Sequence, residues 1–597
     1  MSPTLPWYLR RLIEYPHLMP ALFIVLAVLL CHVLNFPLTS DEFFHQLTFR
    51  QHPMLNVSNP FTDLFSFATG EPSRIRTLIE RSGLVWFTDP HIKSNFLRPL
   101  SAVTHWIDFT LWPDSSTLPR IHSFLWYGLN IALAFVLFNT LFKDKRIALI
   151  GVLFFALSIH HYLPIAWIAA RNALLTCGMS MITLLLYFKA CDDNWNLGFV
   201  LAPIALLIAL LCGEASLSIT PFLFACVLFI DKRPKPRALL SLLPCVLVSL
   251  LWLYAYQALG YGAEYSGYYI SPQDNPLIYG QRLLVSMPLL LFGAIFNLPP
   301  DPSSAALGTK SASFLITYLI SFGAFILFLY FIYALVLPFI KKDRMIGFWL
   351  IALIVSLLPG ASVSASSRTL IIPGLASIGL LLSIIHNVFF QNESIKPHAL
   401  RLLKGIMLLR VCVFFISSIA ISAFSMTIDH DHVLYSPTFN GFNITDNTSI
   451  FAITQTSNQT LIASSRYVVE KYVQMKNAYT LFYPSHDFEI TRTPSNELIA
   501  ASSESLISGF NASSFHNLYR DFKHKPFFIG ETFTTADMDI SILELNALGA
   551  PVKIQFSFKP ALDDNNHLWL ITDTKTNRFI PFELPATGET KHYTMSK

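Results

Sequence analysis

Two adjacent carboxylates, Asp41 and Glu42, follow a long apolar stretch and are the side chains best suited to proton transfer. A carboxylate at the edge of the hydrocarbon is partly desolvated, which raises its proton affinity and lets it accept a proton from a hydroxyl nucleophile. The structural alternative is a helix cap, because Ser40 and Asp41 are good N-cap types. The pair is therefore either a general base with its neighbour or a solvated cap.

Arginines beside other apolar stretches could bind a phosphate. Arg368 and Arg171 each come just before such a stretch, and a planar guanidinium can bind two phosphate oxygens at once. Either side chain could instead extend its charged end from the membrane boundary and need no ligand. Arg98 has the same two interpretations.

His160 and His161 follow an apolar stretch, and Glu214 lies in a short turn between two more. Adjacent histidines do not form the one-sided pair of His-x-x-x-His, so hydrogen bonds to a phosphate or sugar are favoured over a metal. A divalent metal would need a third ligand, for which the candidates are Asp89, His91 and Asp108. Because an unpaired carboxylate at the membrane is unfavourable, Glu214 needs a salt-bridge partner or a ligand.

Composition identifies a membrane protein. Of 597 residues, 53% are hydrophobic and only 13% are charged, against roughly 25% charged in soluble domains, and the mean hydropathy is +0.50. The 41 basic residues nearly balance 37 acidic ones without a long basic run, which excludes a nucleic-acid partner. No cysteine follows Cys412, so the polar C-terminal region has no disulfides.

Apolar stretches near the length of a membrane span, about 20 residues, recur between residues 18 and 426. Lys and Arg gather after every second stretch, namely after residues 121–142, 173–188, 215–230, 313–340 and 370–390. Such residues mark the cytoplasmic side, so we expect a cytoplasmic N-terminus and eleven spans. The first, residues 18–34, lacks a cleavage site and reads as a retained anchor. For the basic residues to stay on the cytoplasmic side after every second span, residues 283–297 must not cross the membrane. We therefore expect this segment, which contains Pro288, to form a re-entrant or interfacial helix.

The chain divides into two parts at about residue 426. Residues 1–426 form the predicted transmembrane module, including a long first outer loop at 37–120 in which 73–87, with Trp86, read as an amphipathic helix on the membrane. Residues 427–597 combine a helical pattern at 460–474 with strand patterns at 478–483, 552–558 and 567–572. The expected fold is a polytopic α-helical membrane protein with a C-terminal extracytoplasmic α+β domain.

Several motifs carry a family resemblance in the same order along residues 41–373. Asp41-Glu42 and the aromatic residue after them resemble the motif that opens the first outer loop of protein O-mannosyltransferases and their GT-C relatives. Residues 95–100 and 108–113 are similar to segments of the membrane mannosyltransferases whose animal members carry tetratricopeptide repeats. The most specific matches are Phe-Ala-Leu-Ser-Ile-His-His, ending at His161, and Ala-Trp-Ile-Ala-Ala-Arg, ending at Arg171. Glu214 and residues 365–373 match further family segments.

The resemblance implies a GT-C-type membrane glycosyltransferase that uses a polyprenyl-phosphate-linked sugar donor. The sugar would pass, with inversion, to a hydroxyl of a protein or glycolipid acceptor on the outer face. Asp41 would be the base and Glu42 would position the acceptor, while the donor phosphate would be bound by Arg368, Arg171, His160 and His161. Arg98, Asp108 and Glu214 are further site candidates. No metal site is assigned, although a divalent metal is compatible with the family.

Two other functions fit the same residues. A transporter or flippase of a lipid-linked saccharide would explain the spans and the arginines equally well, but not the carboxylate pair, and no internal repeat is detected. An inactive relative that binds a partner is the third interpretation. The topology fits a bacterial inner membrane with a periplasmic C-terminal domain, and an endoplasmic reticulum location has the same topology.

Overall fold

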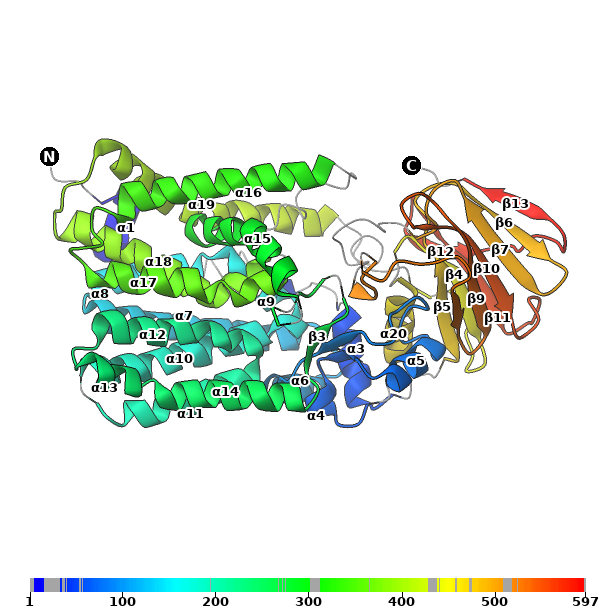
Figure 1. The fold of residues 1–597 in the computed structure, drawn as a ribbon, viewed down its shortest axis with the longest axis horizontal. Coiled ribbons are helices and arrows are strands. Elements are labelled where there is room, and N and C mark those ends of the chain that lie inside the picture. The colour runs from blue at the N-terminus through cyan, green and yellow to red at the C-terminus, as the bar shows by residue number, and fades with distance from the viewer. Residues whose placement is uncertain are drawn as a thin grey trace. The chain divides into compact units, whose positions relative to one another are not determined.

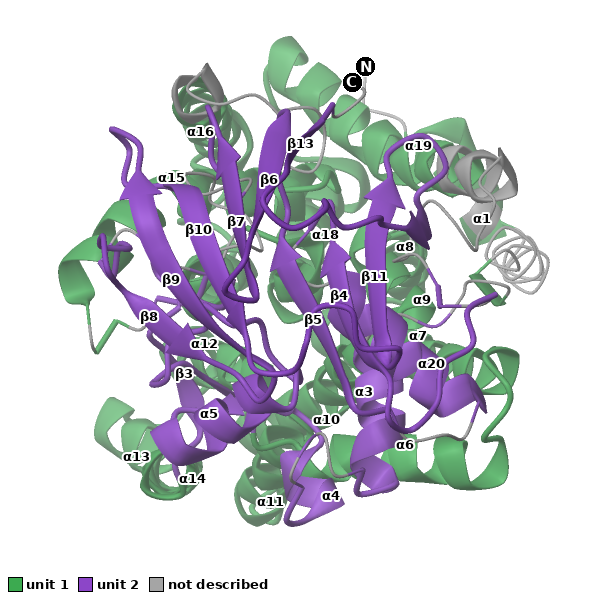
Figure 2. Cartoon of the chain, turned by 90° about the vertical axis from the view of Figure 1, so that its right-hand side faces the viewer, with its two compact units in different colours: residues 1–36, 97–259, 271–425 green, residues 37–96, 260–270, 426–597 purple. Residues whose placement is uncertain are grey.

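The chain folds into two compact units, coloured separately in Figure 2. The computed structural model describes residues 5–14, 33–34, 38, 40–52, 55, 57–193, 195–266, 268–270, 272–273, 275–300, 312–363, 365–427, 438–439, 441–456, 459–471, 475–507, 518–522 and 524–594. Unit 1 comprises residues 1–36, 97–259 and 271–425, and unit 2 comprises residues 37–96, 260–270 and 426–597. Unit 1 is helical, whereas unit 2 combines sheets and helices (Figure 1).

Unit 1 is built from apolar helices. Its α-helices are α1 (Trp7–Glu14), α6 (Pro99–Leu111), α7 (Thr117–Phe142), α8 (Lys145–Ala156), α9 (Tyr162–Ala166), α10 (Asn172–Asp192), α11 (Gly198–Cys212), α12 (Thr220–Ala225), α13 (Lys235–Leu240), α14 (Leu243–Ala258), α15 (Pro276–Phe296), α16 (Ala312–Phe331), α17 (Arg344–Ser356), α18 (Ile371–Ile385) and α19 (Pro397–Thr427). Short 3-10 or π turns continue or join them at η2 (Ile159–His161), η3 (Ile168–Ala170), η4 (Glu214–Ile219), η5 (Cys226–Ile230), η6 (Ile332–Val336), η7 (Pro359–Ser362), η8 (Ser367–Leu370) and η9 (His386–Phe390).

These helices confirm a multi-pass membrane protein. Within the described residues, eight helices are long and apolar enough to cross a bilayer, and a ninth is counted if the bent pair Lys145–Ala156 and Ile159–Ala166 is one span. The predicted fifth and sixth spans are the shorter helices Gly198–Cys212 and Glu214–Ile230. The predicted first span falls almost wholly outside the described residues. The total of eleven therefore stays a prediction.

The connection between α7 and α8 shows how local sequence sets the helix ends. Lys143 ends α7 in the left-handed conformation, with φ of 53°, and Asp144 caps α8 by accepting the Arg146 N–H at 2.8 Å. Small residues then let the helices approach closely. A Cβ added to Gly379 of α18 would lie 2.2 Å from the Trp349 indole of α17. These helices are therefore joined by tight turns and held together by close packing.

The C-terminal end of α15 is buried and bonded to two other helices. Asn297 ends α15 with φ of 59°, and its side-chain amide donates to Leu157 O at 2.9 Å and to Arg410 O at 3.1 Å. Its carbonyl oxygen accepts the Ile159 N–H at 3.1 Å, so one side chain bonds both sides of the break between α8 and η2. The Arg410 guanidinium donates to Ala294 O at 2.7 Å and Ile295 O at 2.9 Å, capping the last turn of α15.

α15 begins at Pro276, earlier than the expected segment 283–297, and continues through Pro288. It is long and apolar enough to cross a bilayer. Its far end, however, lies against Arg410 near the middle of α19. The absence of a crossing at residues 283–297 stays a prediction.

Unit 2 contains three sheets. A small antiparallel sheet has the order β1-β2-β3, from β1 (Ser66–Thr69), β2 (Lys93–Asn95) and β3 (Gly262–Glu264). The six-stranded antiparallel sheet has the order β13-β6-β7-β10-β9-β8, from β6 (Phe488–Thr493), β7 (Glu497–Ser502), β8 (Thr532–Thr534), β9 (Met538–Leu545), β10 (Pro551–Phe558) and β13 (Thr590–Tyr593). The four-stranded sheet has the order β12-β11-β4-β5, from β4 (Ser449–Ile453), β5 (Asn477–Phe482), β11 (His567–Asp573) and β12 (Arg578–Pro581). The helices of unit 2 are α3 (Ser40–Phe49), α4 (Pro60–Asp63), α5 (Pro72–Glu80) and α20 (Gln459–Lys471).

The four-stranded sheet is covered on both faces within unit 2. Strand β4 runs parallel to β11 and β5, pairing Ile453 with Ile571, and every residue of β4 and β5 is buried. One face contributes Phe451 and Phe482 to a core shared with the six-stranded sheet, and the other packs against α3 and α20 (Figure 2). Buried parallel strands need cover on both sides, which explains their continuous apolar sequence. The predicted helix at 460–474 and strands at 478–483, 552–558 and 567–572 are confirmed.

The first outer loop divides differently from our expectation. Residues 37–96 and 260–270 belong to unit 2 with the C-terminal region, whereas residues 97–120 belong to unit 1. The interpretation of residues 73–87 as a surface helix on the membrane is wrong. Helix α5 ends at Glu80, and Trp86 is 2% exposed, with its indole N–H donating to Leu481 O at 2.8 Å. The Trp86 ring is therefore part of the hydrophobic core of unit 2.

Asn297 allows a test of the joint at the end of α15. Asn297→Ala should lower the free energy of unfolding by about 3–5 kcal/mol, because it removes three buried hydrogen bonds and keeps a Cβ at positive φ. Asn297→Gly should be milder by about 1 kcal/mol, because glycine tolerates that φ. Thermal unfolding of the purified proteins in detergent measures which variant is the less stable. An equal loss of stability in the two variants, or a smaller loss in Asn297→Ala, would contradict the hydrogen bonds described for Asn297.

Candidate functional site

One ion pair among the sequence candidates of unit 1 joins Arg98 to Glu214. Arg98 is the N-cap residue of α6, and Glu214 is the first residue of η4. The Arg98 guanidinium contacts both carboxylate oxygens, with Nε donating to Oε2 at 2.9 Å and a terminal nitrogen contacting Oε1. The partner that Glu214 needs at a membrane boundary is therefore an arginine of the same unit. The charges of Arg98 and Glu214 therefore cancel each other.

Arg368 lies near this pair but carries a different set of contacts. Its guanidinium stands 5.9 Å from the centre of the Trp167 ring and interacts electrostatically with Glu214. In the part of the chain that the structure describes, no carboxylate lies within 4 Å of Arg368, and its guanidinium makes no hydrogen bond. The Trp167 indole N–H is buried and also lacks a partner among the described residues. Arg368 thus keeps its five N–H donors available to an anion.

His160 and His161 stand behind this loop, because η2 packs against η8, the turn that carries Arg368. Both histidines are buried. His160 Nε2 lies 3.2 Å from Gly293 O of α15, and the His161 ring centre lies 4.4 Å from that of Phe155. Within the described residues, no group of three His, Cys, Asp or Glu side chains could hold a metal ion. The contacts observed for the two histidines are with the bundle itself.

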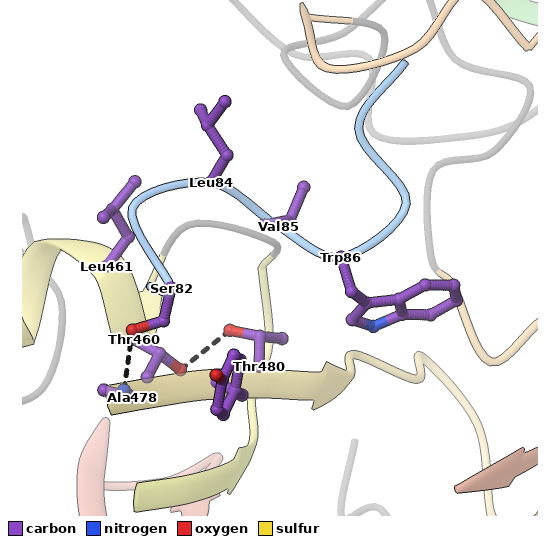
Figure 3. A pocket seen from close by; sticks show the side chains of 9 residues that line it. Ser82, Leu84, Val85, Trp86, Thr460, Leu461, Ala478 and Thr480 are labelled. Carbon is purple, nitrogen blue, oxygen red and sulfur yellow. Dashed lines mark hydrogen bonds between the residues drawn. The ribbon is translucent and has the colours of Figure 1, made fainter. Parts of the chain in front are cut away.

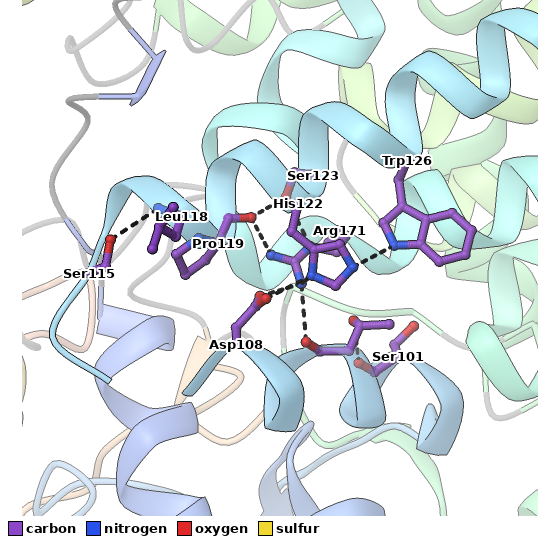
Figure 4. Close-up of polar contacts among 10 residues, drawn as sticks. Ser101, Asp108, Ser115, Leu118, Pro119, His122, Ser123, Trp126 and Arg171 are labelled. Atoms are coloured by element: carbon purple, nitrogen blue, oxygen red, sulfur yellow. Dashed lines mark hydrogen bonds and ion pairs between the residues drawn. The ribbon is translucent and has the colours of Figure 1, made fainter. Parts of the chain in front are cut away.

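Arg171 is bonded on every nitrogen (Figure 4). Nε donates to Ser123 Oγ at 2.9 Å, one terminal nitrogen donates to Pro119 O at 2.6 Å, and the other forms an ion pair with Asp108. Arg171 and Asp108 are both fully buried. A guanidinium that is saturated in this way joins α6, α7 and α10. We therefore assign Arg171 and Asp108 a structural contact, while a role in donor binding stays a prediction.

His122 and Trp126 complete this network and were missed in the sequence. His122 Nδ1 lies 2.7 Å from Asp108 Oδ1, and the Trp126 indole N–H donates to His122 Nε2 at 3.1 Å (Figure 4). Because Nε2 accepts the hydrogen bond from Trp126, the ring proton of His122 is on Nδ1, and Nδ1 donates a hydrogen bond to Asp108. The one available signal was their i,i+4 spacing, which places both rings on one face of α7.

Asp41 and Glu42 occupy the first turn of α3 in unit 2, where the positive end of the helix dipole favours carboxylates. Glu42 is fully buried, whereas Asp41 is partly exposed. Burial, and secondly the charge of Asp41, raise the pKa of Tyr519, so the Asp41 carboxylate lies within electrostatic range of that phenol. Because α3 begins at Ser40, both carboxylates lie inside its first turn and neither is observed as the N-cap residue, and Asp41 retains access to solvent.

A small pocket in unit 2 lies between residues 82–86, α20 and β5 (Figure 3). Its polar groups are bonded to one another, with Ser82 Oγ accepting the Ala478 N–H at 2.8 Å and Thr480 Oγ1 donating to Thr460 Oγ1 at 2.7 Å. A ligand would have to displace these bonds. The pocket therefore joins elements and offers few free polar groups.

Comparison with known proteins gives no relative, since neither a protein-family model nor a curated protein sequence matches the chain.

The two arginines should respond differently to removal of their charge. Arg171→Met should lower the free energy of unfolding by about 3–5 kcal/mol, because it leaves buried Asp108 without its cation. Arg368→Met should change it by less than about 1 kcal/mol, because no hydrogen bond or ion pair is lost. Thermal unfolding in detergent would compare them. Adding Asp108→Leu to Arg171→Met should recover part of the loss, and a larger loss in Arg368→Met than in Arg171→Met would contradict these assignments.

Proposed function

We propose that this protein is an integral membrane glycosyltransferase of the GT-C type. It transfers a sugar from a polyprenyl-phosphate carrier to a hydroxyl acceptor, a protein or a glycolipid, on the outer face of the membrane. The observation that carries the proposal is Arg368, a partly exposed guanidinium that stands 5.9 Å from the centre of the Trp167 ring and has no carboxylate within 4 Å among the described residues. The donor is a phosphate diester, an anion that the Arg368 guanidinium can bind at two oxygens.

The surroundings of Arg368 favour an anion such as the donor phosphate. The Arg98–Glu214 pair is electrically neutral, so Arg368 leaves this cluster with one net positive charge. In a poorly hydrated site such a charge stabilises negative charge that grows on a leaving phosphate. The Trp167 ring restricts the guanidinium, which reduces the reorganisation needed during reaction.

The reaction would proceed as an inverting displacement at the anomeric carbon. The acceptor oxygen forms a bond to that carbon as the carbon–oxygen bond to the phosphate breaks, and polyprenyl phosphate leaves. Asp41 takes the acceptor proton, and Glu42 positions the acceptor. Arg368 compensates the charge on the leaving phosphate. Binding of the donor phosphate by His160, His161 and Arg171 stays a prediction. The contacts observed for them join η2 to α15 and join α6, α7 and α10.

Transfer tests the proposal directly. Membranes containing the protein receive polyprenyl-phosphate sugars labelled in the sugar, with mannose and arabinose forms in turn. Asp41→Asn should lower transfer by about 10²–10⁴-fold with donor binding retained, because the base is lost. Arg368→Gln should weaken donor binding as well. Asp539→Asn, which changes an exposed carboxylate of β9, is the matched control and should behave as the unmodified protein.

One outcome would replace the proposal. If the unmodified protein binds the labelled lipid but leaves the label on it, while the lipid crosses the membrane of reconstituted vesicles, transport of a lipid-linked saccharide is the function. In that case Arg368→Gln would reduce transport and Asp41→Asn would not.

The location belongs to the same proposal. We propose a bacterial inner membrane because the outer domain has no cysteine, and we propose a cytoplasmic N-terminus and a periplasmic C-terminal domain because Lys and Arg gather after alternate apolar stretches. Alkaline phosphatase fused after Lys597 should be active, and green fluorescent protein fused there through the Sec pathway should be dark. The reverse pattern would invert the proposed topology and remove Asp41 from the outer face.

A further inference from the structure

An exposed tyrosine in unit 2 is held in an unusual backbone conformation. Tyr265 directly follows β3, and its φ is 58°, in the left-handed region that a bulky side chain rarely occupies. It is nevertheless 52% exposed, so burial of its ring does not explain the conformation. Residues held in this way persist where the surrounding structure fixes them, and they concentrate at functional sites.

Charged groups converge on the Tyr265 ring from two other segments. Lys525 Nζ stands 4.9 Å from the ring centre, and the His91 ring centre lies 5.9 Å away. Asp89 organises both groups, since its carboxylate lies 2.8 Å from Lys525 Nζ, accepts the backbone N–H of His91 at 2.8 Å and stands 3.4 Å from Nδ1 of the His91 ring. The Asp89 side chain is only 2% exposed. A buried carboxylate therefore fixes a cation and an imidazole beside an exposed aromatic ring.

This patch of Tyr265, Lys525, His91 and Asp89 continues toward Asp41 within unit 2. The Asp89 N–H donates to Tyr519 O at 2.9 Å. The phenol of the same Tyr519 lies within electrostatic range of the Asp41 carboxylate. One residue thus connects the patch to the proposed base.

We propose that this patch binds a saccharide ring of the acceptor. A sugar ring has an apolar C–H face, which fits an aromatic ring, and a rim of hydroxyls, which need hydrogen-bond donors and acceptors. Lys525, which lies over one face of the Tyr265 ring, and His91 beside it supply such groups and leave the other face of the ring for the sugar. The assignment to the acceptor rests on the proposed transferase function, and it selects a glycan or glycolipid over an unmodified protein.

A metal would not suit the same groups. Asp89 already pairs with Lys525, whose ammonium would repel a divalent cation. Because Asp89 and Lys525 already neutralise each other beside the aromatic ring, the patch matches a neutral polyol better.

Saturation-transfer NMR on the full-length protein in nanodiscs tests direct binding. The probes are the methyl glycosides of glucose, galactose, mannose and glucosamine, each at millimolar concentration. We expect transfer to the ring C–H protons of at least one glycoside, reduced at least fivefold in Tyr265→Gly and retained in Tyr265→Trp. Glycine is chosen because it tolerates the positive φ, so the thermal unfolding temperature should equal or exceed that of the unmodified protein.

Phe528→Ala is the matched control, because Phe528 is an exposed aromatic residue of the same unit, 61% accessible. It should leave the transfer unchanged. Absence of transfer to all four glycosides, or equal transfer in Tyr265→Gly, would overturn the saccharide site.

Loss of label from the polyprenyl-phosphate donor, measured in parallel in membranes that contain the protein together with their native acceptors, separates the two proposals. Binding that depends on Tyr265, without any turnover of donor, would refute the transferase and leave the saccharide site standing. Donor turnover with no binding that depends on Tyr265 would refute the saccharide site alone.

Discussion

The architecture of unit 1 depends on one constraint, that backbone polar groups within a membrane must be bonded inside the protein. The break between α8 and η2 and the end of α15 would both violate it. Asn297 and Arg410 satisfy it together, since the amide of Asn297 bonds Leu157, Ile159 and the backbone of Arg410, while the Arg410 guanidinium caps α15. A charged residue is retained in an apolar helix because the carbonyls that it bonds would otherwise have no partner.

The same joint reaches the proposed phosphate site through the two histidines. His160 lies against Gly293 in the last turn of α15, and η2 packs against η8, which presents Arg368. The position of that guanidinium therefore depends on a helix break, and the break depends on Asn297. Broken helices in membranes commonly mark sites where polar groups are needed at depth. The adjacent histidines fit this arrangement as a support for the loop, and their candidate contact with a ligand stays a prediction.

Periodicity and hydropathy were enough to predict the elements, but not their partners. The apolar stretches gave most spans, and α20, β5, β10 and β11 lie where the patterns indicated. Trp86 was misplaced because a buried aromatic core and a membrane-surface helix have the same local composition. The assignment of residues 37–96 to unit 2 could not be predicted, since pairing of α3 with α20 joins segments about 400 residues apart. Likewise, His122 gave no signal stronger than its spacing to Trp126.

The arginines show why residue type alone could not define the site. Arg98, Arg171 and Arg368 have the same chemistry, and all three stand at the ends of apolar stretches. Arg171 spends its donors on Ser123, Pro119 and Asp108, and Arg98 is neutralised by Glu214. Arg368 has an aromatic ring in place of an anion. An arginine that is not neutralised retains attraction for a mobile anion, whereas the donors of a saturated arginine are already used within the protein. The distribution of partners, and not the number of cations, therefore makes Arg368 the one of these three arginines best suited to bind the proposed donor.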